Sequence, residues 1–311
     1  MVGGLAFLFP GQASQKAGMA TDLLAQEAAA RDVFAEAEAV LGLPMTEYCT
    51  TADDATLTRT EVAQPALLTT SVAWLRVVTA RGLRPSLVAG HSLGEFAAWV
   101  AAGVLSFPEA LRLVGRRGEL MEAAGTKRPG AMLAVIGMPD ARVQELCEQA
   151  QAEGVAVVAN YNSPGQVVVS GEAAALAKLA ELVKVERGRA LPLRVSGAFH
   201  SPLMAGAGAA FAALVAAAEL RDPTTPVVSN ATAQVVRTAA EGRAAMTAQM
   251  TSSVRWTASV ACMVGEGIGT FLEVGPGTVL TKLVERIAPE VRARAVGAPV
   301  ELSSLIEEIA Q

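Results

Sequence analysis

Leu87-Val88-Ala89-Gly90-His91-Ser92-Leu93-Gly94-Glu95 is a short apolar run followed by a glycine-flanked serine and the start of a helix-prone segment that extends to Val104. This pattern predicts a strand, a sharp turn and a helix, with Ser92 at the turn. In the Gly-x-Ser-x-Gly spacing, the residues two before and two after the serine come close to strand and helix backbone, so both must lack side chains. A chance match in a glycine-rich loop would contain the same letters, but the flanking strand and helix favour the turn.

The predicted turn leaves the hydroxyl of Ser92 exposed at a helix N-terminus, where unpaired N–H groups and the helix dipole favour negative charge on a bound substrate. The N–H of Leu93 is one candidate oxyanion donor. A nucleophilic serine needs a base, and the sequence has two histidines. His91 adjoins the serine, and consecutive side chains at the end of a strand point to opposite sides. His200, in the small-residue loop 196–202, is therefore the better candidate, although a loop histidine without a role would look the same.

The composition limits the class of protein. The 311 residues, of which 52% are hydrophobic, can bury a large core in one big domain or two linked domains. A net charge of -5 argues against nucleic-acid binding, which needs clustered Lys and Arg. We expect no membrane span and no signal peptide, because no apolar run is long enough and no basic segment precedes the first one. The three scattered cysteines lack metal-ligand spacing and fit free thiols in a reducing cytoplasm, with no metal site.

Short buried strands alternate with helices along most of the chain, which predicts an α/β protein with a parallel sheet. Ligands bind at the carboxyl ends of the strands of such sheets, where Ser92 would lie. Besides the strand that ends at Gly90, the expected strands of this sheet are residues 5–9, 227–229 and 271–274. The expected helices are residues 22–30, 32–41, 65–80, 108–124, 203–219, 239–250 and 279–287. The last twenty residues are expected to be a tail with one amphipathic helix, residues 302–309.

The middle of the chain has a different rhythm. Strands are expected at residues 131–136, 155–160, 167–170 and 190–195, and helices at residues 140–152 and 172–185. This βαββαβ order is ferredoxin-like and predicts a small inserted domain, the alternative being that these strands extend the main sheet. The chain then divides into a large domain (1–127 and 197–287), the insert (128–196) and a C-terminal tail (288–311). A cleft between the two bodies would have Ser92 at its floor.

Arg117 is a cation in an unexpected place on the predicted helix 108–124. At about 100° per residue the apolar side chains form one broad arc, and Arg117 falls inside it, whereas Arg112, Arg116 and Glu119 lie opposite. A buried guanidinium must find an anion or several acceptors, because an unpaired buried charge is costly. An internal salt bridge and a bound ligand are equally compatible with the pattern. If the partner is a ligand, the planar fork of the guanidinium suits a carboxylate best.

Six motifs occur in a fixed order along residues 1–287. They are Phe9-Pro10-Gly11-Gln12, Gly90-His91-Ser92-Leu93-Gly94, Arg116-Arg117-Gly118, Asn160-Tyr161-Asn162-Ser163-Pro164-Gly165-Gln166, Phe199-His200-Ser201-Pro202-Leu203-Met204 and Glu273-Val274-Gly275-Pro276-Gly277. This series resembles the malonyl-CoA:acyl-carrier-protein transacylases and the related polyketide-synthase acyltransferases. The resemblance implies an α/β-hydrolase-like large domain with a ferredoxin-like insert, in agreement with the pattern of elements.

The resemblance also implies roles for single residues. Ser92 matches the family's nucleophile and His200 its base, and the backbone N–H groups of Leu93 and Gln12 match its oxyanion hole. Arg117 matches the residue that binds the malonyl carboxylate, which would decide between the two partners left open above.

Further positions match with less specific roles. The backbone of Gln249 would orient the histidine, His91 and Asn160 would line the site, and Phe199 matches relatives that transfer malonyl groups. No cofactor and no metal is implied, and a monomer is expected. Ala13 departs from the family, which usually has glycine there, and a positive φ at this position would shift the neighbouring oxyanion donor slightly.

The implied reaction is ping-pong transfer of a malonyl group from malonyl-CoA, through a malonyl-serine, to the phosphopantetheine thiol of an acyl carrier protein in fatty-acid synthesis. Carrier proteins are acidic, so some basic surface must face the cleft, and Lys127, Arg128 and Arg187 are candidates, although a solvated face explains each as well. Three alternatives stay open: a trans-acting polyketide-synthase acyltransferase, a serine esterase or thioesterase, for which a buried Arg117 has no use, and a non-catalytic docking subunit.

Overall fold

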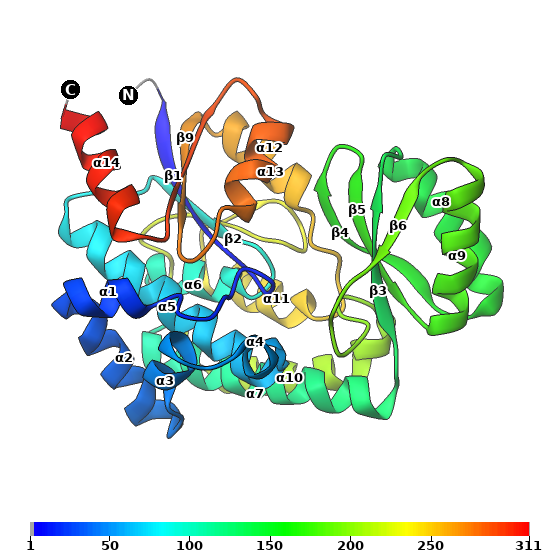
Figure 1. Cartoon of the computed structure of the whole chain (residues 1–311), viewed down its shortest axis with the longest axis horizontal. Coiled ribbons are helices and arrows are strands. Elements are labelled where there is room, and N and C mark those ends of the chain that lie inside the picture. The colour runs from blue at the N-terminus through cyan, green and yellow to red at the C-terminus, as the bar shows by residue number, and fades with distance from the viewer. Residues whose placement is uncertain (1–2, 311) are drawn as a thin grey trace.

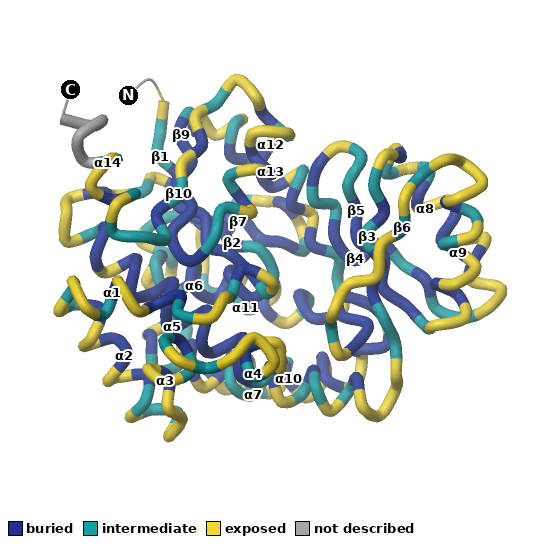
Figure 2. Tube along the Cα trace, viewed as in Figure 1, coloured by how far each residue is buried: buried dark blue, intermediate teal, exposed yellow. Residues whose placement is uncertain are grey.

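The computed structural model describes residues 3–310, and residues 3–305 with their side chains. Residues 1 and 2 of the predicted large domain and residue 311 of the predicted tail lie outside the described residues. Figure 1 shows a large lobe, in which helices surround one sheet, and a smaller lobe built on a second sheet at its side. Buried residues follow the strands and the long helix α5 (Thr60–Ala80), and exposed residues follow the outer helices and loops (Figure 2).

The sheet of the large lobe has six strands in the order β10-β9-β1-β2-β7-β8. All its neighbouring strands are parallel except β7 and β8, which form an antiparallel edge pair. The predicted α/β class with a parallel sheet is therefore confirmed. The strands are β1 (Gly4–Phe9), β2 (Leu87–Gly90), β7 (Val227–Val228), β8 (Val235–Val236), β9 (Ile268–Val274) and β10 (Arg292–Val296).

Alternation along β1 divides the core of this lobe into two layers. Phe7 and Phe9 point into a cluster that includes residues of α2, α5, α6, α7 and α10, whereas Ala6 and Leu8 point to the opposite face, against α12 and α13. Successive side chains of a strand face opposite sides, so a central strand between two helical layers must be apolar at every position. The helices of the large lobe are α1 (Thr21–Gln26), α2 (Ala28–Leu41), α3 (Met45–Thr50), α4 (Asp54–Thr58), α5, α6 (Gly94–Ala101), α7 (Phe107–Lys127), α10 (Ala205–Ala217), α11 (Ala239–Gln249), α12 (Trp256–Gly265), α13 (Val279–Ile287) and α14 (Pro299–Ala310), with a short 3-10 turn at Pro202–Met204.

The sheet of the smaller lobe is antiparallel, with four strands in the order β4-β5-β3-β6. In chain order this is the second, third, first and fourth strand of a βαββαβ unit, so the strands form a sheet of their own and do not extend the main sheet. One face of the sheet packs on two helices, and the other face turns toward the large lobe. The elements are β3 (Ala131–Ile136), α8 (Asp140–Ala150), a 3-10 turn at Gln151–Glu153, β4 (Ala156–Ser163), β5 (Gln166–Gly171), α9 (Ala173–Val185) and β6 (Arg189–Pro192).

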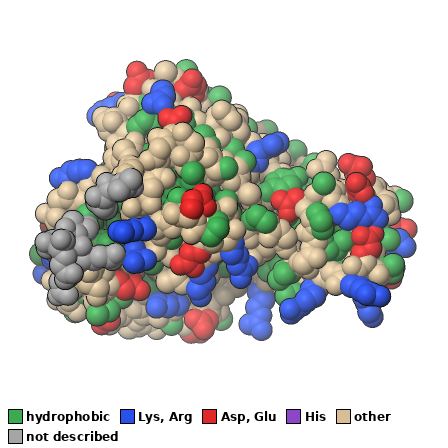
Figure 3. Space-filling view, turned by 90° about the horizontal axis from the view of Figure 1, so that it is seen from above, with side chains coloured by type: hydrophobic (Ala, Val, Ile, Leu, Met, Phe, Trp, Pro, Cys, Tyr) green, Lys and Arg blue, Asp and Glu red, His purple; other side chains and the backbone are tan. Residues whose placement is uncertain are grey.

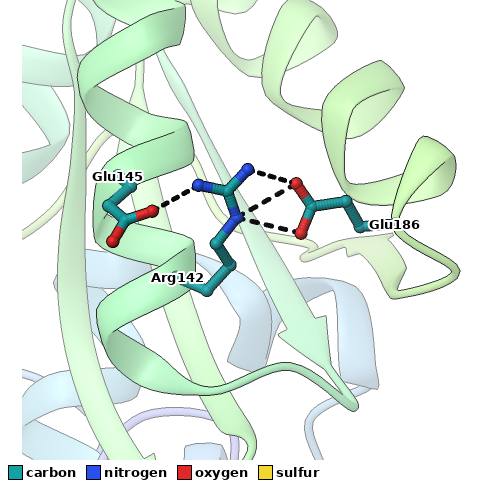
Figure 4. A network of polar contacts seen from close by, with 3 residues as sticks. All are labelled: Arg142, Glu145 and Glu186. Carbon is teal, nitrogen blue, oxygen red and sulfur yellow. Dashed lines mark hydrogen bonds and ion pairs between the residues drawn. The ribbon is translucent and has the colours of Figure 1, made fainter.

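An ion-pair network ties the two helices of the smaller lobe together. Arg142 on α8 bonds to Glu145 one turn further along and to Glu186 at the end of α9 (Figure 4). These carboxylates raise the pKa of Arg142 above its usual value. The network is exposed, so solvent screens it and its effect on stability is small.

Several predicted helix boundaries are wrong. The break between the first two helices falls at Glu27, whose extended backbone (φ -117°, ψ 112°) ends one helix and begins the next, and not near residue 31. Helix α5 begins at Thr60, five residues before the expected start, with Pro65 inside the helix. The helix expected at residues 203–219 begins as a 3-10 turn and continues as α10, which ends at Ala217.

The expectation of a tail with one helix is wrong for residues 292–296. These residues form β10, which pairs with β9 along its length and extends the main sheet. Buried Ala293 and Val296 alternate with exposed Arg292 and Arg294. Charged residues are common on edge strands, and here they interrupt the apolar run that would indicate a strand in the sequence. Helices α3, α4 and α12 and the two-residue strand β8 were not predicted either.

The two lobes are joined along β4. Val254 of the large lobe bridges to Asn160 in parallel, because its N–H donates to the oxygen of Ala159 (2.8 Å) and its oxygen accepts from the N–H of Tyr161 (2.9 Å). The hydroxyl of Ser253 adds a bond to the oxygen of Val158 (2.6 Å). Backbone pairing of this kind fixes the smaller lobe at one side of the cleft.

Candidate active site

The turn around Ser92 is tight enough to forbid side chains at both flanking glycines. A Cβ on Gly90 would lie 2.0 Å from the carbonyl of Gly94, and a Cβ on Gly94 would lie 2.0 Å from the carbonyl oxygen of Phe9. Ser92 itself has φ 51°, in the left-handed region. The strand-turn-helix predicted from the Gly-x-Ser-x-Gly spacing therefore forms with the expected steric restriction.

Two side chains hold the backbone of this strained serine. Asn230 accepts from the N–H of Ser92 (2.6 Å) and donates to the oxygen of Gly90 (2.6 Å). Gln249 donates from Nε2 to the oxygen of Ser92 (2.9 Å). Both polar groups of the serine backbone are thus occupied, which stabilises a conformation that costs of order 1–3 kcal/mol.

His200 meets the serine side chain. Its Nε2 lies 2.7 Å from Oγ of Ser92, and its Nδ1 lies 3.0 Å from the backbone oxygens of both Gln249 and Ser252. Because carbonyl oxygens only accept, Nδ1 carries the proton and Nε2 is the acceptor for the hydroxyl. Burial, with the charge of Arg117 as a second cause, lowers the pKa of His200 to about 3, so the ring is neutral at neutral pH.

The two backbone N–H groups named as oxyanion donors are open. Within residues 3–310, neither the N–H of Leu93 nor that of Gln12 has an acceptor in the protein. Gln12 lines the cleft beside Ser92. The next residue, Ala13, has φ 83°, and its N–H donates to Oε1 of Gln15 (2.7 Å). The positive φ considered for this position is therefore present, on a residue with a Cβ.

Arg117 lies at the floor of the site with 1% of its surface exposed. Its Nη1 donates to Oε1 of Gln64 (2.8 Å), and its Nη2 donates to Oε1 of Gln249 (3.0 Å) and lies 3.4 Å from Oγ of Ser92. The guanidinium carbon is 5.7 Å from the centre of the Phe96 ring. Burial lowers the pKa of Arg117 to about 10, which leaves it charged at neutral pH.

Of the two partners left open for Arg117, no internal salt bridge is found in the part of the chain that the structure describes. The buried carboxylate of Glu95 acts on the guanidinium only from a greater distance, with Gln249 between them. Nε of Arg117 is buried and, among the described residues, has no partner. The cation is thus held by neutral amides, with Nη2 beside the serine hydroxyl and Nε buried behind it without a partner among the described residues.

A cleft of about 360 Å³ opens over Ser92 and His200, between the two lobes, and the predicted site residues Arg117, Leu93 and Gln249 are not among the residues that line it. Of the remaining predicted site residues, His91, Asn160 and Phe199 all line it. His91 does not face the serine hydroxyl, since its Nε2 lies 2.8 Å from Oδ1 of Asn162 and its ring packs against Trp256. The cleft is lined by Gly11, Gln12, Ala13, Ser14, Gln15, Thr58, His91, Ser92, Met121, Met132, Ala134, Asn160, Asn162, Gln166, Val168, Leu193, Arg194, Val195, Phe199, His200, Val279, Leu280 and Leu283.

The basic side chains around the cleft differ from those predicted. Lys127, Arg128 and Arg187 are exposed, but none of them lines the cleft, whereas Arg194, which was not predicted, does. Figure 3 shows Lys and Arg side chains protruding along the lower rim of the face in view, over both lobes. Asp and Glu side chains lie among them on the same face.

Sequence reasoning missed three polar residues of the site: Glu95, Asn230 and Gln64. Glu95 has a sequence signal like that of Arg117, because it is a lone acid in the otherwise apolar helix α6. Asn230 follows β7 at the carboxyl end of the sheet, where polar residues of α/β proteins gather. Gln64 had no such signal, because its helix was expected to begin after it.

The described residues contain neither a candidate metal site nor a candidate membrane span. Within the described residues, no group of three or more His, Cys, Asp or Glu side chains could hold a metal ion. No helix in that part of the chain has the length and apolar character needed to cross a membrane.

A serine hydroxyl 2.7 Å from a neutral imidazole and close to a buried cation, at the end of a parallel sheet, is an arrangement that suits acyl transfer. The chain belongs to the acyl transferase domain family, whose sequence pattern matches residues 6–300.

Within that family, the chain is similar to proteins named malonyl CoA-acyl carrier protein transacylase. It is 41% identical to the protein of Bacillus subtilis (strain 168) over 308 residues, which is 98% of this chain and 97% of that protein. It is 40% identical to the protein of Escherichia coli (strain K12), over 97% of this chain and 98% of that one.

The chain is also similar in structure to solved malonyl transacylases. The malonyl-CoA:acyl carrier protein transacylase of Xanthomonas oryzae pv. oryzae superposes with a TM-score of 0.95 at 41% identity, covering 98% of each chain. A malonyl-transacylase solved in complex with its type II polyketide-synthase acyl-carrier protein superposes with a TM-score of 0.95 at 39% identity, covering 98% of this chain and 99% of that one.

Proposed function

We propose that this chain transfers malonyl groups from malonyl-CoA to the phosphopantetheine thiol of an acyl carrier protein. The observation that carries the proposal is the arrangement of Ser92, His200 and Arg117. The serine oxygen lies 2.7 Å from a neutral imidazole and 3.4 Å from a buried guanidinium nitrogen. The full-length similarity to malonyl transacylases supports the same activity.

In the first half-reaction Nε2 of His200 takes the proton of Ser92, and Oγ attacks the thioester carbonyl of malonyl-CoA. The negative charge of the tetrahedral intermediate falls to the open N–H groups of Leu93 and Gln12. When the carbon–sulfur bond breaks, the proton on His200 passes to the departing thiolate. Coenzyme A leaves, and a malonyl ester remains on the serine.

In the second half-reaction the thiol of the carrier's phosphopantetheine enters the same cleft. His200 takes the thiol proton, the sulfur attacks the malonyl-serine ester, and the same N–H groups hold the new oxyanion. Collapse breaks the ester bond and returns the proton from His200 to Oγ of Ser92. The residues of this chain carry every proton, so no metal or organic cofactor is needed for the cycle, and we expect none.

Arg117 selects for a free carboxylate. In a malonyl ester the carboxylate carbon is separated from the ester carbon by two C–C bonds of about 1.5 Å each, which matches a guanidinium next to the serine oxygen. The carboxylate also offsets the positive charge that lowers the pKa of His200. A bound malonyl group therefore makes its own base stronger, which an acetyl group does not do.

Intact-mass measurement tests the acylation step. Incubation with malonyl-CoA should add one malonyl group to the chain, on the peptide that contains Ser92, and holo carrier protein should remove it. Ser92→Ala should take up none. A wild-type chain that gains no adduct, or whose adduct is released to water faster than to the carrier thiol, would exclude the proposal, and the second outcome would favour an esterase.

The variant Arg117→Ala tests carboxylate selection. Loss of a charge-assisted bond of about 1.5–3 kcal/mol predicts that kcat/KM for malonyl-CoA falls roughly 10- to 100-fold. The value for acetyl-CoA should change much less. Single-turnover acylation of both thioesters measures the ratio, and equal losses would mean that the arginine only supports the fold.

A second candidate has the same chemistry with a different carrier, because one of the similar structures is a malonyl-transacylase bound to a polyketide-synthase carrier. A fatty-acid carrier and a polyketide carrier, offered together to the malonylated chain, would compete for the group and show which pathway it serves. We further propose that the chain acts as a monomer in the cytoplasm, which fits its free cysteines.

A further inference from the structure

Glu95 is a buried carboxylate with no part in the reaction derived above. It lies in the first turn of α6, three residues after Ser92, and none of its surface is exposed. Each of its oxygens accepts one N–H donor. Oε1 accepts from the backbone N–H of Asn230 (2.8 Å), and Oε2 accepts from Nε2 of Gln249.

Both donors are residues that hold the active site. The side chain of Asn230 binds the N–H of Ser92 and the oxygen of Gly90. Gln249 makes three contacts with the site: Nε2 donates to the oxygen of Ser92, Oε1 accepts from Arg117, and the backbone oxygen faces Nδ1 of His200. Through these two residues, one carboxylate is connected by hydrogen bonds to Ser92, His200 and Arg117.

The contacts of Gln249 have a fixed polarity. Its NH₂ group faces two acceptors, Glu95 and the oxygen of Ser92, and its oxygen faces the cation of Arg117. If the amide turned over, NH₂ would meet the guanidinium and the amide oxygen would meet a carboxylate. An ionised Glu95 forbids that orientation because a carboxylate can only accept. A neutral group at position 95 no longer excludes the turned amide. It carries a donor of its own, which cannot bond to the N–H groups of Asn230 and Gln249 that meet there.

We propose that Glu95 is a positioning residue for acyl transfer: its carboxylate fixes the Gln249 amide and the Asn230 backbone, and through them the orientation of Arg117, His200 and the Ser92 turn. This inference rests on the proposed function and names a residue on which that function depends. Glu95 touches neither substrate nor reacting atom, so it acts through its two hydrogen-bond partners and, from a distance, through its charge on Arg117.

Protonation of Glu95 is expected near neutral pH. Burial raises the pKa of Glu95 to about 7, although the N–H donors of Asn230 and Gln249 and the charge of Arg117 oppose the rise. The other titratable groups of the site are His200 and His91, and burial lowers the pKa of both. As the pH falls through about 7, Glu95 therefore gains a proton while both histidines stay neutral, and acylation should slow.

The test compares wild type with Glu95→Gln, which keeps the shape and removes the charge. Loss of one charge-assisted bond predicts that acylation by malonyl-CoA at about pH 8 falls roughly 10- to 100-fold. The loss should be larger for malonyl-CoA than for acetyl-CoA. The wild-type rate should fall on the acid side of neutrality, and the variant should have lost that pH dependence. Rapid quench with intact-mass detection of the Ser92 adduct measures all three.

A double-variant cycle with Gln249→Ala shows whether Glu95 acts through the amide. In the Gln249→Ala background, Glu95→Gln should cost much less than in wild type, and additive losses would contradict the inference. Glu172→Gln is the matched control, because Glu172 is also a carboxylate that accepts from a backbone N–H, that of Val155, but lies in the smaller lobe away from the site. It should acylate as wild type does.

Two further outcomes keep this proposal separate from the proposed function. If wild type forms no malonyl adduct, the proposed function fails, and the double-variant cycle has no rate to compare. If wild type and Glu95→Gln form the adduct at the same rate, the positioning role of Glu95 fails while the function stands. Should Glu95→Gln not fold, Gln249→Ala decides: it should slow acylation by malonyl-CoA more than acylation by acetyl-CoA, and rates equal to those of wild type would sink the inference.

Discussion

Three residues of the active site, each with a Cβ, have a left-handed backbone. Ser92 has φ 51°, His200 has φ 57° and Ala13 has φ 83°. Ser92 donates its N–H to Asn230 and accepts from Gln249, which holds its backbone, and the His200 ring donates to the backbone oxygen of Ser252. For Ala13 no reactive side chain is gained, so its strain is a cost that a glycine would remove.

Ala13→Gly should raise stability. Relief of the left-handed conformation is worth about 1–2 kcal/mol, and the extra freedom of glycine in the unfolded chain takes back about 0.5–1 kcal/mol. The expected net gain is up to about 1.5 kcal/mol, measured as a shift of the urea midpoint at constant slope. A midpoint that falls would mean that the Cβ of Ala13 makes packing contacts that outweigh the strain.

At the scale of elements, the strand-turn-helix that presents Ser92 depends on backbone contact across two glycines. Gly94→Ala would place a Cβ 2.0 Å from the oxygen of Phe9, on the neighbouring strand β1. Both atoms belong to rigid backbone, so strand or helix must move, and we expect a loss of several kcal/mol or failure to fold.

Gly206→Ala is the contrasting substitution. Gly206 lies in helix α10, and a Cβ there would meet nothing within 4 Å. Alanine in a helix should gain about 0.5–1 kcal/mol over glycine. Thermal melts of the two variants should therefore move in opposite directions, and a harmless Gly94→Ala would refute the steric account of the turn.

The elements and residues that could be predicted from sequence are those whose signal is local. The strand before Ser92, the βαββαβ order of the smaller lobe and the misplaced cation Arg117 all follow from apolar periodicity and spacing. Strand β10 was not predicted because its arginines interrupt the apolar run. The start of α5 was placed too late because proline usually marks the first turn of a helix. Asn230 and Gln64 depend on contacts between distant segments, which no local pattern records.

At the scale of the whole molecule, buried ionisable groups make stability depend on pH. The unfolded chain protonates His200 below its ordinary pKa of 6.5, whereas the folded chain holds it neutral down to a pKa of about 3. Between these values the unfolded state binds more protons, so stability rises with pH and is lost as the pH falls. Glu95 contributes the opposite slope between 4.5 and about 7, because its folded pKa is raised.

The variant His200→Gln isolates the first of these effects. The stability of wild type minus that of the variant should grow by roughly 1–2 kcal/mol between about pH 5 and pH 6.5, because each pH unit inside the window is worth about 1.4 kcal/mol. Urea unfolding at several pH values gives the difference directly. A constant difference would show that the imidazole titrates alike in the folded and unfolded chains.

Under the proposed function, the cleft at Ser92 admits both coenzyme A and the carrier's prosthetic arm, which carry the same kind of thiol. Each half-reaction exchanges one thioester for the serine ester or back again, and the products of one direction are the reactants of the other. A catalyst built this way sets no preferred direction. The relative supply of charged and uncharged thiols decides which way malonyl units flow, so the chain equilibrates two pools and leaves the driving force to whatever consumes the loaded carrier.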